Sequence, residues 1–217
     1  MTVFALAAAA YLVWFAVIEI AATRLRLPAE VSRKFAHVTM AVGAAALPLW
    51  LTQPQVAVLG LLFAVGMVVS WRTRFLSSIH DVRRTTLGEI WFPAGIAAAA
   101  LVAPTATAFA YAVLTMGVSD VAACLVGERA PARARRIPGG TKTYRGSSAF
   151  FVTTVVLGVP FLVLCGQGAL RACGVAGCVA AVTTVTEAAA GRGLDNLCIP
   201  PVAAAAMILL RITGVMR

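Results

Sequence analysis

The sequence predicts an all-α fold: a polytopic transmembrane helix bundle of about seven to eight spans, in a single integral membrane domain that covers residues 1–217. Three observations predict this fold. Hydrophobic residues make up 61% of the chain and charged residues 12%, with a mean hydropathy of +0.92, whereas soluble domains are about half apolar. Apolar runs close to the roughly 20 residues that cross a bilayer recur along the chain. Short polar connections separate these runs.

The breaks between the apolar runs define the expected spans in order. The first span has no basic segment before it and no obvious cleavage site after it, so we expect a retained helix rather than a signal peptide. Stretches rich in Ala and Gly let helix backbones approach closely, which predicts a tight bundle. The expected spans are 2–22, 36–51, 55–71, 88–103, 106–126, 149–165, 172–190 and 197–213.

Positively charged residues alternate between the connections. Lys and Arg number four in the first connection, four in the third and six in the fifth, none in the second and fourth, and one each in the sixth and seventh. Because cytoplasmic loops carry the excess of Lys and Arg, we expect the odd-numbered connections in the cytosol and the N-terminus outside. Arg211 and Arg217 disagree with eight spans, so seven or eight stays open. A bacterial inner membrane is the expected location.

Net charge and cysteine usage exclude two classes of function. The net charge of +10 would favour nucleic acid in a soluble protein, but here the basic residues lie in short loops between spans, so no nucleic-acid partner is expected. The five cysteines form no CxxC pair and mostly lie in apolar stretches, so we expect neither a metal site nor a disulfide from them. The oligomeric state stays open.

Two polar clusters lie at the start of expected spans, where a charge is costly unless it is paired or used. Arg33, Lys34 and His37 enter the second span with the spacing of one helix face. A basic anchor that reaches the interface, with a capped histidine, explains them equally well. Glu89 begins the fourth span, and Arg84 or its neighbour could pair with it.

Asp120 is the single residue that the sequence most strongly indicates as functional. Ser119 and Asp120 lie inside a segment that is otherwise apolar from 109 to 126, so the carboxylate needs a partner or a cation. Ala123 and Gly127 complete a face of small residues, which allows a ligand or a second helix to come close.

A loop rich in glycine and hydroxyl groups precedes the sixth span. Glycines, hydroxyls and two cations at a helix N-terminus suit a polyphosphate, although the spacing is not that of a P-loop. The candidate nucleotide contacts in this loop are Thr141, Lys142, Thr143, Arg145, Gly146 and Ser147.

The last polar segments supply more carboxylates. Glu187 lies near the cytosolic end of the seventh span, and the pair Asp195 and Asn196 follows it. Together with Asp120 they could share a Mg²⁺, although Asp195 could equally be a helix N-cap. All the clusters fall on the predicted cytosolic side, which suits phosphoryl transfer from a nucleotide to a lipid-embedded acceptor.

These motifs, in this order, resemble the CTP-dependent polyprenol kinases, a family that includes dolichol kinase, phytol kinase and the fungal-type CTP-dependent diacylglycerol kinase. The resemblance implies a kinase that uses CTP and Mg²⁺ to phosphorylate a membrane lipid alcohol, such as phytol, farnesol, geranylgeraniol or a polyprenol. The matching segments are 33–37, 84–89 with 92–93, 119–127, 142–147 and 194–200.

The resemblance also implies roles for residues. Arg33, Lys34 and the 142–147 loop resemble phosphate contacts, and Asp120 with Asp195 resembles the metal and catalytic acidic set. Arg84 is a further candidate nucleotide contact, and Glu187 and Asn196 are further candidate metal ligands. Glu89 and Ser119 belong to the matched motifs without an assigned role. On chemical grounds Asp120 is the candidate to orient or deprotonate the alcohol, with His37 second.

The chain departs from the family at two positions. Arg145 stands where the family usually has an acidic residue, and Cys198 stands where it has a hydroxyl residue. Two other functions stay open: a cytidylyltransferase, which would use the same CTP and Mg²⁺ to make a CDP-lipid, and a non-enzymatic membrane transporter or assembly factor. The lack of an internal repeat speaks against the transporter.

Overall fold

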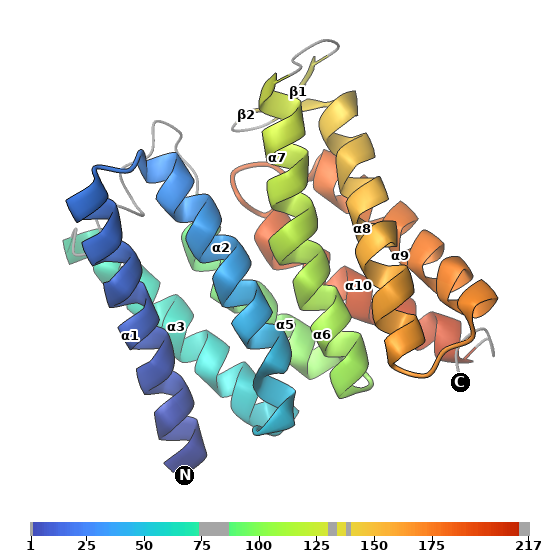
Figure 1. The fold of residues 1–217 in the computed structure, drawn as a ribbon, viewed down its shortest axis with the longest axis horizontal. Coiled ribbons are helices and arrows are strands. Elements are labelled where there is room, and N and C mark those ends of the chain that lie inside the picture. Colours follow the sequence, from blue (N-terminus) through green and yellow to red (C-terminus); the bar gives the residue numbers. More distant parts are fainter. Residues whose placement is uncertain (1, 74–86, 130–133, 138–139, 213–217) are drawn as a thin grey trace.

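A computed structural model describes residues 2–73, 87–129, 134–137 and 140–212. Within these ranges eight helical rods form a bundle (Figure 1), and one of them changes type along its length. The rods are α1 (Thr2–Leu25), α2 (Ala29–Ala46), α3 (Gln53–Thr73), α5 (Gly88–Val102), α6 (Ala106–Leu114) continuing through a π-helical segment (Thr115–Ser119) into α7 (Asp120–Arg129), α8 (Tyr144–Leu164), α9 (Ala169–Ala189) and α10 (Asp195–Ile212).

The expected all-α membrane bundle is confirmed. Six of the described helices are long and apolar enough to cross a membrane by length and composition: α1, α3, the α6–α7 rod, α8, α9 and α10. Of the other two, α5 is shorter at 15 residues, and α2 carries charged residues in its first two turns. Large apolar side chains such as Leu164 and Leu170 are exposed on the outside of the bundle, where a soluble protein would be polar.

The structure corrects two local predictions. The first connection is much shorter than expected, because α2 begins at Ala29 rather than near residue 36. Pro28 precedes that helix start, and proline is compatible with a helix N-terminus but not with a helix interior. A small antiparallel hairpin, β1 (Ala134–Ile137) and β2 (Gly140–Thr143), also interrupts the otherwise helical chain.

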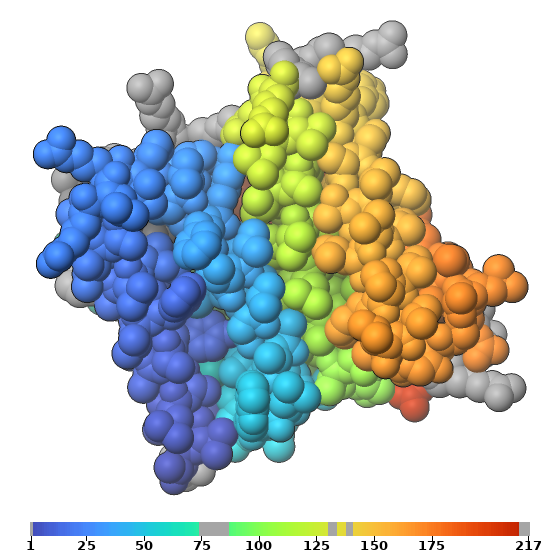
Figure 2. Space-filling model, viewed as in Figure 1, coloured from blue at the N-terminus to red at the C-terminus, as the bar shows by residue number. Residues whose placement is uncertain are grey.

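The α6–α7 rod runs through the middle of the bundle. Figure 2 shows one face, on which α1, α2, the rod, α8 and α9 lie side by side. Residues 108–113 in the α6 half of the rod are buried, and Phe109 and Tyr111 among them have no exposed surface. The Tyr111 hydroxyl donates to the Thr154 carbonyl oxygen of α8 at 3.1 Å and lies against Gly158. These contacts fix α8 against the rod.

Small residues allow the close crossings that the sequence predicts. A Cβ on Gly117 would collide with Ala41 of α2, and a Cβ on Gly95 of α5 would collide with the backbone of Asn196 at the start of α10. Because these glycines have no side chain, the rod packs closely against α2, and α5 packs closely against the start of α10.

The hairpin marks one end of the bundle. The start of α1 and the end of α10 both lie toward the opposite end (Figure 1), which is the arrangement that eight crossings produce. Arg211 then lies on the side of the N-terminus, and Arg217 falls outside the described residues.

Candidate active site

Lys142 of the hairpin lies between two carboxylates from other segments. Its Nζ is 2.6 Å from Glu187 Oε1, near the end of α9, and 2.9 Å from Asp195 Oδ2, at the start of α10. Ser147 in the first turn of α8 donates its hydroxyl to Glu187 Oε2 at 2.9 Å. Three of the predicted segments therefore meet at one cluster of direct polar contacts.

Local structure at the start of α8 explains how Lys142 is placed. Thr143 caps the helix, because its Oγ1 accepts from the backbone N–H of Gly146 at 3.0 Å. The hairpin strand β2 ends at this cap, so Lys142 directly precedes the helix start and lies next to α9 and α10. The loop predicted before the sixth span is thus a short strand joined to a capped helix.

The small face on α7 packs against the start of α8, and its Ala123 and Gly127 also line the cavity described below. A Cβ on Gly146 would lie 2.9 Å from the Ala123 carbonyl oxygen, and a Cβ on Gly127 would lie 2.9 Å from Thr143 Oγ1. The glycines let α7 and α8 cross in contact. The sequence analysis allowed either a ligand or a second helix at this face. The crossing brings Asp120 to the same end of the bundle as Lys142.

Asp120 follows the π-helical segment Thr115–Ser119, and segments of this type are frequent at functional sites. Ser119 and Asp120, the pair that the sequence analysis singled out, have different surroundings. Ser119 is fully buried and accepts a hydrogen bond from the Thr154 hydroxyl at 3.0 Å, so it holds α8 to the rod. Asp120 faces a cavity and interacts electrostatically with Asp195 and Lys142.

That cavity has a volume of about 380 Å³, within the usual range of small-molecule sites. Its lining combines four carboxylates with three cations, contributed by α2, α7, β2, α9, α10 and the turn before α10. These residues are Asp120, Glu128, Glu187, Asp195, Arg33, Lys142 and Arg192.

The charge of Lys142 is stabilised by its surroundings. Burial alone would lower the pKa of the ammonium, but the negative charges of Asp195, Asp120 and Glu187 outweigh burial and raise the pKa above its usual range. Lys142 is therefore a cation held among carboxylates at any physiological pH.

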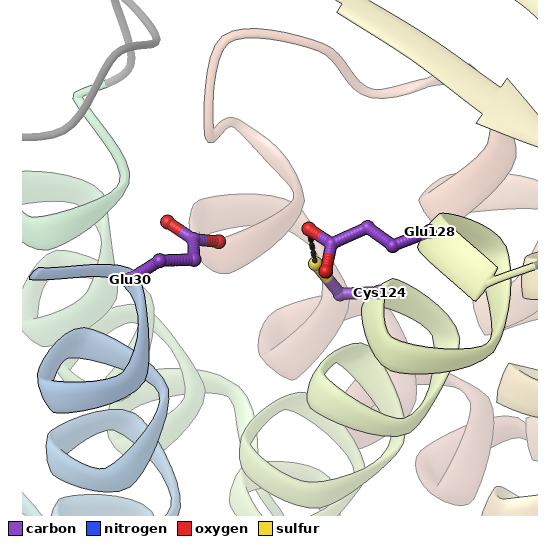
Figure 3. A group of neighbouring side chains, drawn as sticks. All are labelled: Glu30, Cys124 and Glu128. Atoms are coloured by element: carbon purple, nitrogen blue, oxygen red, sulfur yellow. Dashed lines mark hydrogen bonds between the residues drawn. The ribbon is translucent and has the colours of Figure 1, made fainter. Parts of the chain in front are cut away.

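Arg33 and Lys34 are engaged by carboxylates that the sequence analysis did not single out. Arg33 Nη2 is 2.7 Å from Glu30, and Lys34 Nζ is 2.9 Å from Glu128 of α7. Figure 3 shows Glu30 and Glu128 pointing toward each other, with Cys124 donating to Glu128 at 3.3 Å. Since both acidic groups already have basic partners, this cluster is an ion-pair network that joins α2 to α7. Arg33 also faces the cavity, whereas Lys34 is not among its lining residues.

The remaining predicted residues divide between the cavity and other places. Thr141, Thr143, Gly146 and Asn196 line the cavity. Arg145 is exposed and does not line the main cavity or the two smaller cavities described below. Arg84 lies outside the described residues.

His37 and Glu89 line a smaller cavity beside the main one. Arg33 and Asn196 line both cavities. The Asn196 side-chain N–H donates to the Gly88 carbonyl oxygen at 3.0 Å. This bond anchors the start of α10 to α5.

Arg192 is a cavity residue that sequence reasoning treated only as a topology marker. It occupies the left-handed region with φ 56°, next to Gly193 with φ 83°, and a non-glycine residue there is uncommon. Its carbonyl oxygen accepts a hydrogen bond from the Leu87 N–H at 3.3 Å. The Gly-Arg-Gly pattern was a signal of a tight turn that could have drawn attention to this arginine.

One curated relative decides the family. Over 183 residues, which are 80% of this chain and 76% of the relative, the sequence is 30% identical to a phytol kinase of Synechocystis sp.. The chain belongs to the polyprenol and phytol kinase family. The family resemblance predicted from the motifs is thus confirmed. No family model and no solved structure matches the chain.

Proposed function

We propose that this membrane protein is a CTP-dependent kinase that phosphorylates a prenyl alcohol at the cytosolic face of the membrane. The observation that carries the proposal is the meeting of Asp120, Lys142, Glu187 and Asp195, from four separate segments, at one cavity of about 380 Å³. The phytol kinase relative supports a prenyl alcohol as the acceptor. The resemblance to CTP-dependent kinases supports CTP as the donor.

The acidic set fits a divalent cation. Mg²⁺ takes oxygen ligands and is usually bound through one or two carboxylates together with substrate phosphates. Glu187 and Asp195 already hold a cation between them in the form of the Lys142 ammonium, and Asp120 faces the same cavity. Bound there, Mg²⁺ would neutralise negative charge on the transferring phosphoryl group.

The residues of the chain then have separate tasks. Lys142, Arg33 and Arg192 are the cations that contact the nucleotide phosphates. Asp120 orients the alcohol and accepts its proton as the oxygen attacks, which places a carboxylate where a phosphoryl-transfer enzyme needs its base. The positive-inside pattern supports the cytosolic side for this cavity.

The test is a product assay with the purified protein in lipid vesicles. γ-Labelled and α-labelled CTP are supplied in parallel with phytol, farnesol, geranylgeraniol, a polyprenol or diacylglycerol, and ATP replaces CTP in matched reactions. The proposal expects transfer of the γ label to a prenyl alcohol, with CDP as the second product. Asp120→Asn is the inactive control.

Two outcomes would replace the proposal. Release of pyrophosphate with the α label in the lipid identifies a cytidylyltransferase. No turnover of either nucleotide with any of these alcohols favours a non-enzymatic transporter. Faster turnover with ATP than with CTP would retain the kinase and overturn the choice of donor.

A further inference from the structure

Two smaller cavities lie next to the polar cavity. Arg33 and Asn196 line both the main cavity and the smaller cavity that holds His37. Met40, Met67 and Phe92 line that smaller cavity and also the next one, which lies among α1, α2, α3 and α5. The three cavities therefore neighbour one another. The carboxylates line the first, His37 lines the second, and the third is a mainly apolar space between four helices, with Glu89 on its wall as on that of the second.

His37 has an unpartnered acceptor atom at the second cavity. Its side chain is 8% exposed, and one ring nitrogen bonds to the Met116 carbonyl oxygen. The other nitrogen, Nε2, has no partner in the described part of the chain. A neutral imidazole that donates through one nitrogen is an acceptor at the other. A buried acceptor without a donor is unfavourable in free energy, so a ligand that donates a hydrogen bond to this nitrogen would be stabilised.

Asn196 presents a second acceptor. It is 4% exposed, and its amide nitrogen donates to the Gly88 carbonyl oxygen at 3.0 Å. The orientation of the amide is fixed by this bond, because only the nitrogen can donate. The other atom, Oδ1, has no partner among the described residues. Two buried acceptors at one small cavity require a ligand with a hydrogen to donate.

From this arrangement we infer that the smaller cavity binds the hydroxyl end of the prenyl alcohol, with the O–H directed to His37 Nε2 or Asn196 Oδ1 and the first part of the chain on Met40, Met67 and Phe92. The inference rests on the proposed function, which supplies the alcohol. A hydroxyl has one hydrogen, which it donates to one of the two acceptors, and a hydrocarbon chain matches the neighbouring apolar cavity. An alcohol held there lies next to the cavity that contains Asp120.

The size of the space sets how much of the substrate it takes. The His37 cavity holds about 40 Å³ and the apolar cavity about 50 Å³, whereas a cavity that binds benzene measures roughly 150 Å³. The space therefore takes the carbinol end and the beginning of the tail. The remaining tail lies in the bilayer, beside α1, in which Ile18 and Ala22 are the buried residues.

The experiment is photolabelling of the full chain in lipid vesicles without nucleotide. The probe is farnesol with a diazirine on its first isoprene unit, and the labelled residue is identified by mass spectrometry. We expect the label on Met40, Met67 or Phe92, with competition by unlabelled farnesol and phytol. The saturated hydrocarbon of the same length, which lacks the hydroxyl, should compete at least about tenfold less well, since one hydrogen bond to a buried acceptor is lost.

Matched variants locate the site. Met40→Trp fills the space and should reduce labelling about tenfold or more. Val42→Trp places the same ring on the outer face of the same helix, where Val42 is 51% exposed, and should label like the parent. His37→Phe keeps a ring of similar shape without the acceptor, and should reduce the advantage of alcohol over hydrocarbon in the competition, while Asn196 Oδ1 stays available to the hydroxyl.

The position of the label in the unmodified protein decides the inference, whether or not a variant folds. Label confined to outward-facing residues such as Val42, or equal competition by alcohol and hydrocarbon, overturns it. Labelling needs no turnover, so the two proposals separate. Label at Met40 without phosphoryl transfer overturns only the kinase, and phosphoryl transfer with the label elsewhere overturns only this site.

Discussion

Replacement of Lys142 by Met tests whether the ion pairs at the site hold the bundle together. The variant removes the ammonium and keeps most of the side-chain volume. It leaves two carboxylates whose side chains are 3% and 12% exposed, Glu187 and Asp195, without the cation that lies 2.6 and 2.9 Å away. Breaking a buried ion pair by removing one partner costs about 3–5 kcal/mol, because the remaining charge stays buried.

The loss should appear as a lower melting temperature. For chains of this length about 1 kcal/mol corresponds to roughly 2–4 °C, so Lys142→Met should melt roughly 6–20 °C below the parent. The measurement is the fraction of detergent-purified protein that remains monodisperse after heating, without divalent cations. Arg145→Met is the matched control, since Arg145 is exposed in the same segment, and it should change the midpoint by less than about 2 °C.

A double variant separates charge from packing. Lys142→Met with Glu187→Gln removes one negative charge together with the positive one, so it should be more stable than Lys142→Met alone. If Lys142→Met melts within about 2 °C of the parent, the ion pairs do not hold α9 and α10 at the hairpin. If the double variant is as unstable as the sum of the single ones, the loss is not electrostatic in origin.

Three further predictions test the base, the helix crossing and the topology. Asp120→Asn should lose more than about tenfold in turnover while melting near the parent, because the amide removes the charge and keeps the shape; a smaller loss would exclude the carboxylate as base. Gly146→Ala should destabilise by about 1–3 kcal/mol because its Cβ would meet the α7 backbone, whereas Gly177→Ala, with open space around it, should be neutral or stabilising in the same melting assay. The topology is tested in oriented vesicles with a protein variant that lacks the five native cysteines. Thr141→Cys should react with a membrane-impermeant thiol reagent from the cytosolic side, and Gln53→Cys should react from the opposite side. Labelling of both positions from one side would refute the topology.

Much of the fold followed from the sequence because hydrophobic length and charge alternation are properties of single segments. The described helices correspond to the eight expected spans in order. The start of α2 was misplaced because Arg33 and Lys34 were interpreted as loop residues. In the structure they lie on the helix and pair with Glu30 and Glu128. A charge count cannot distinguish a charged first turn from a loop.

The site was predictable as a set of segments but not as a set of contacts. Asp120, Glu187 and Asp195 were grouped because all three were expected on the cytosolic side, and they do line one cavity. Which cation pairs with which carboxylate depends on helix rotation, and the π-helical segment before Asp120 alters that rotation locally. Arg192 was missed because its relevance depends on a left-handed turn, which a single sequence indicates only weakly.

The position of Lys142 between Glu187 and Asp195 also has a consequence for the order of ligand binding. Lys142 must leave at least one of these carboxylates before a divalent cation can take its place, so a cation arriving alone is opposed by the ion pairs that it breaks. A nucleotide offers Lys142 a phosphate as a new partner and lowers that cost. Because thermodynamic linkage is reciprocal, the cation then strengthens nucleotide binding by the same factor. The site should therefore bind metal and nucleotide cooperatively, and either one alone only weakly.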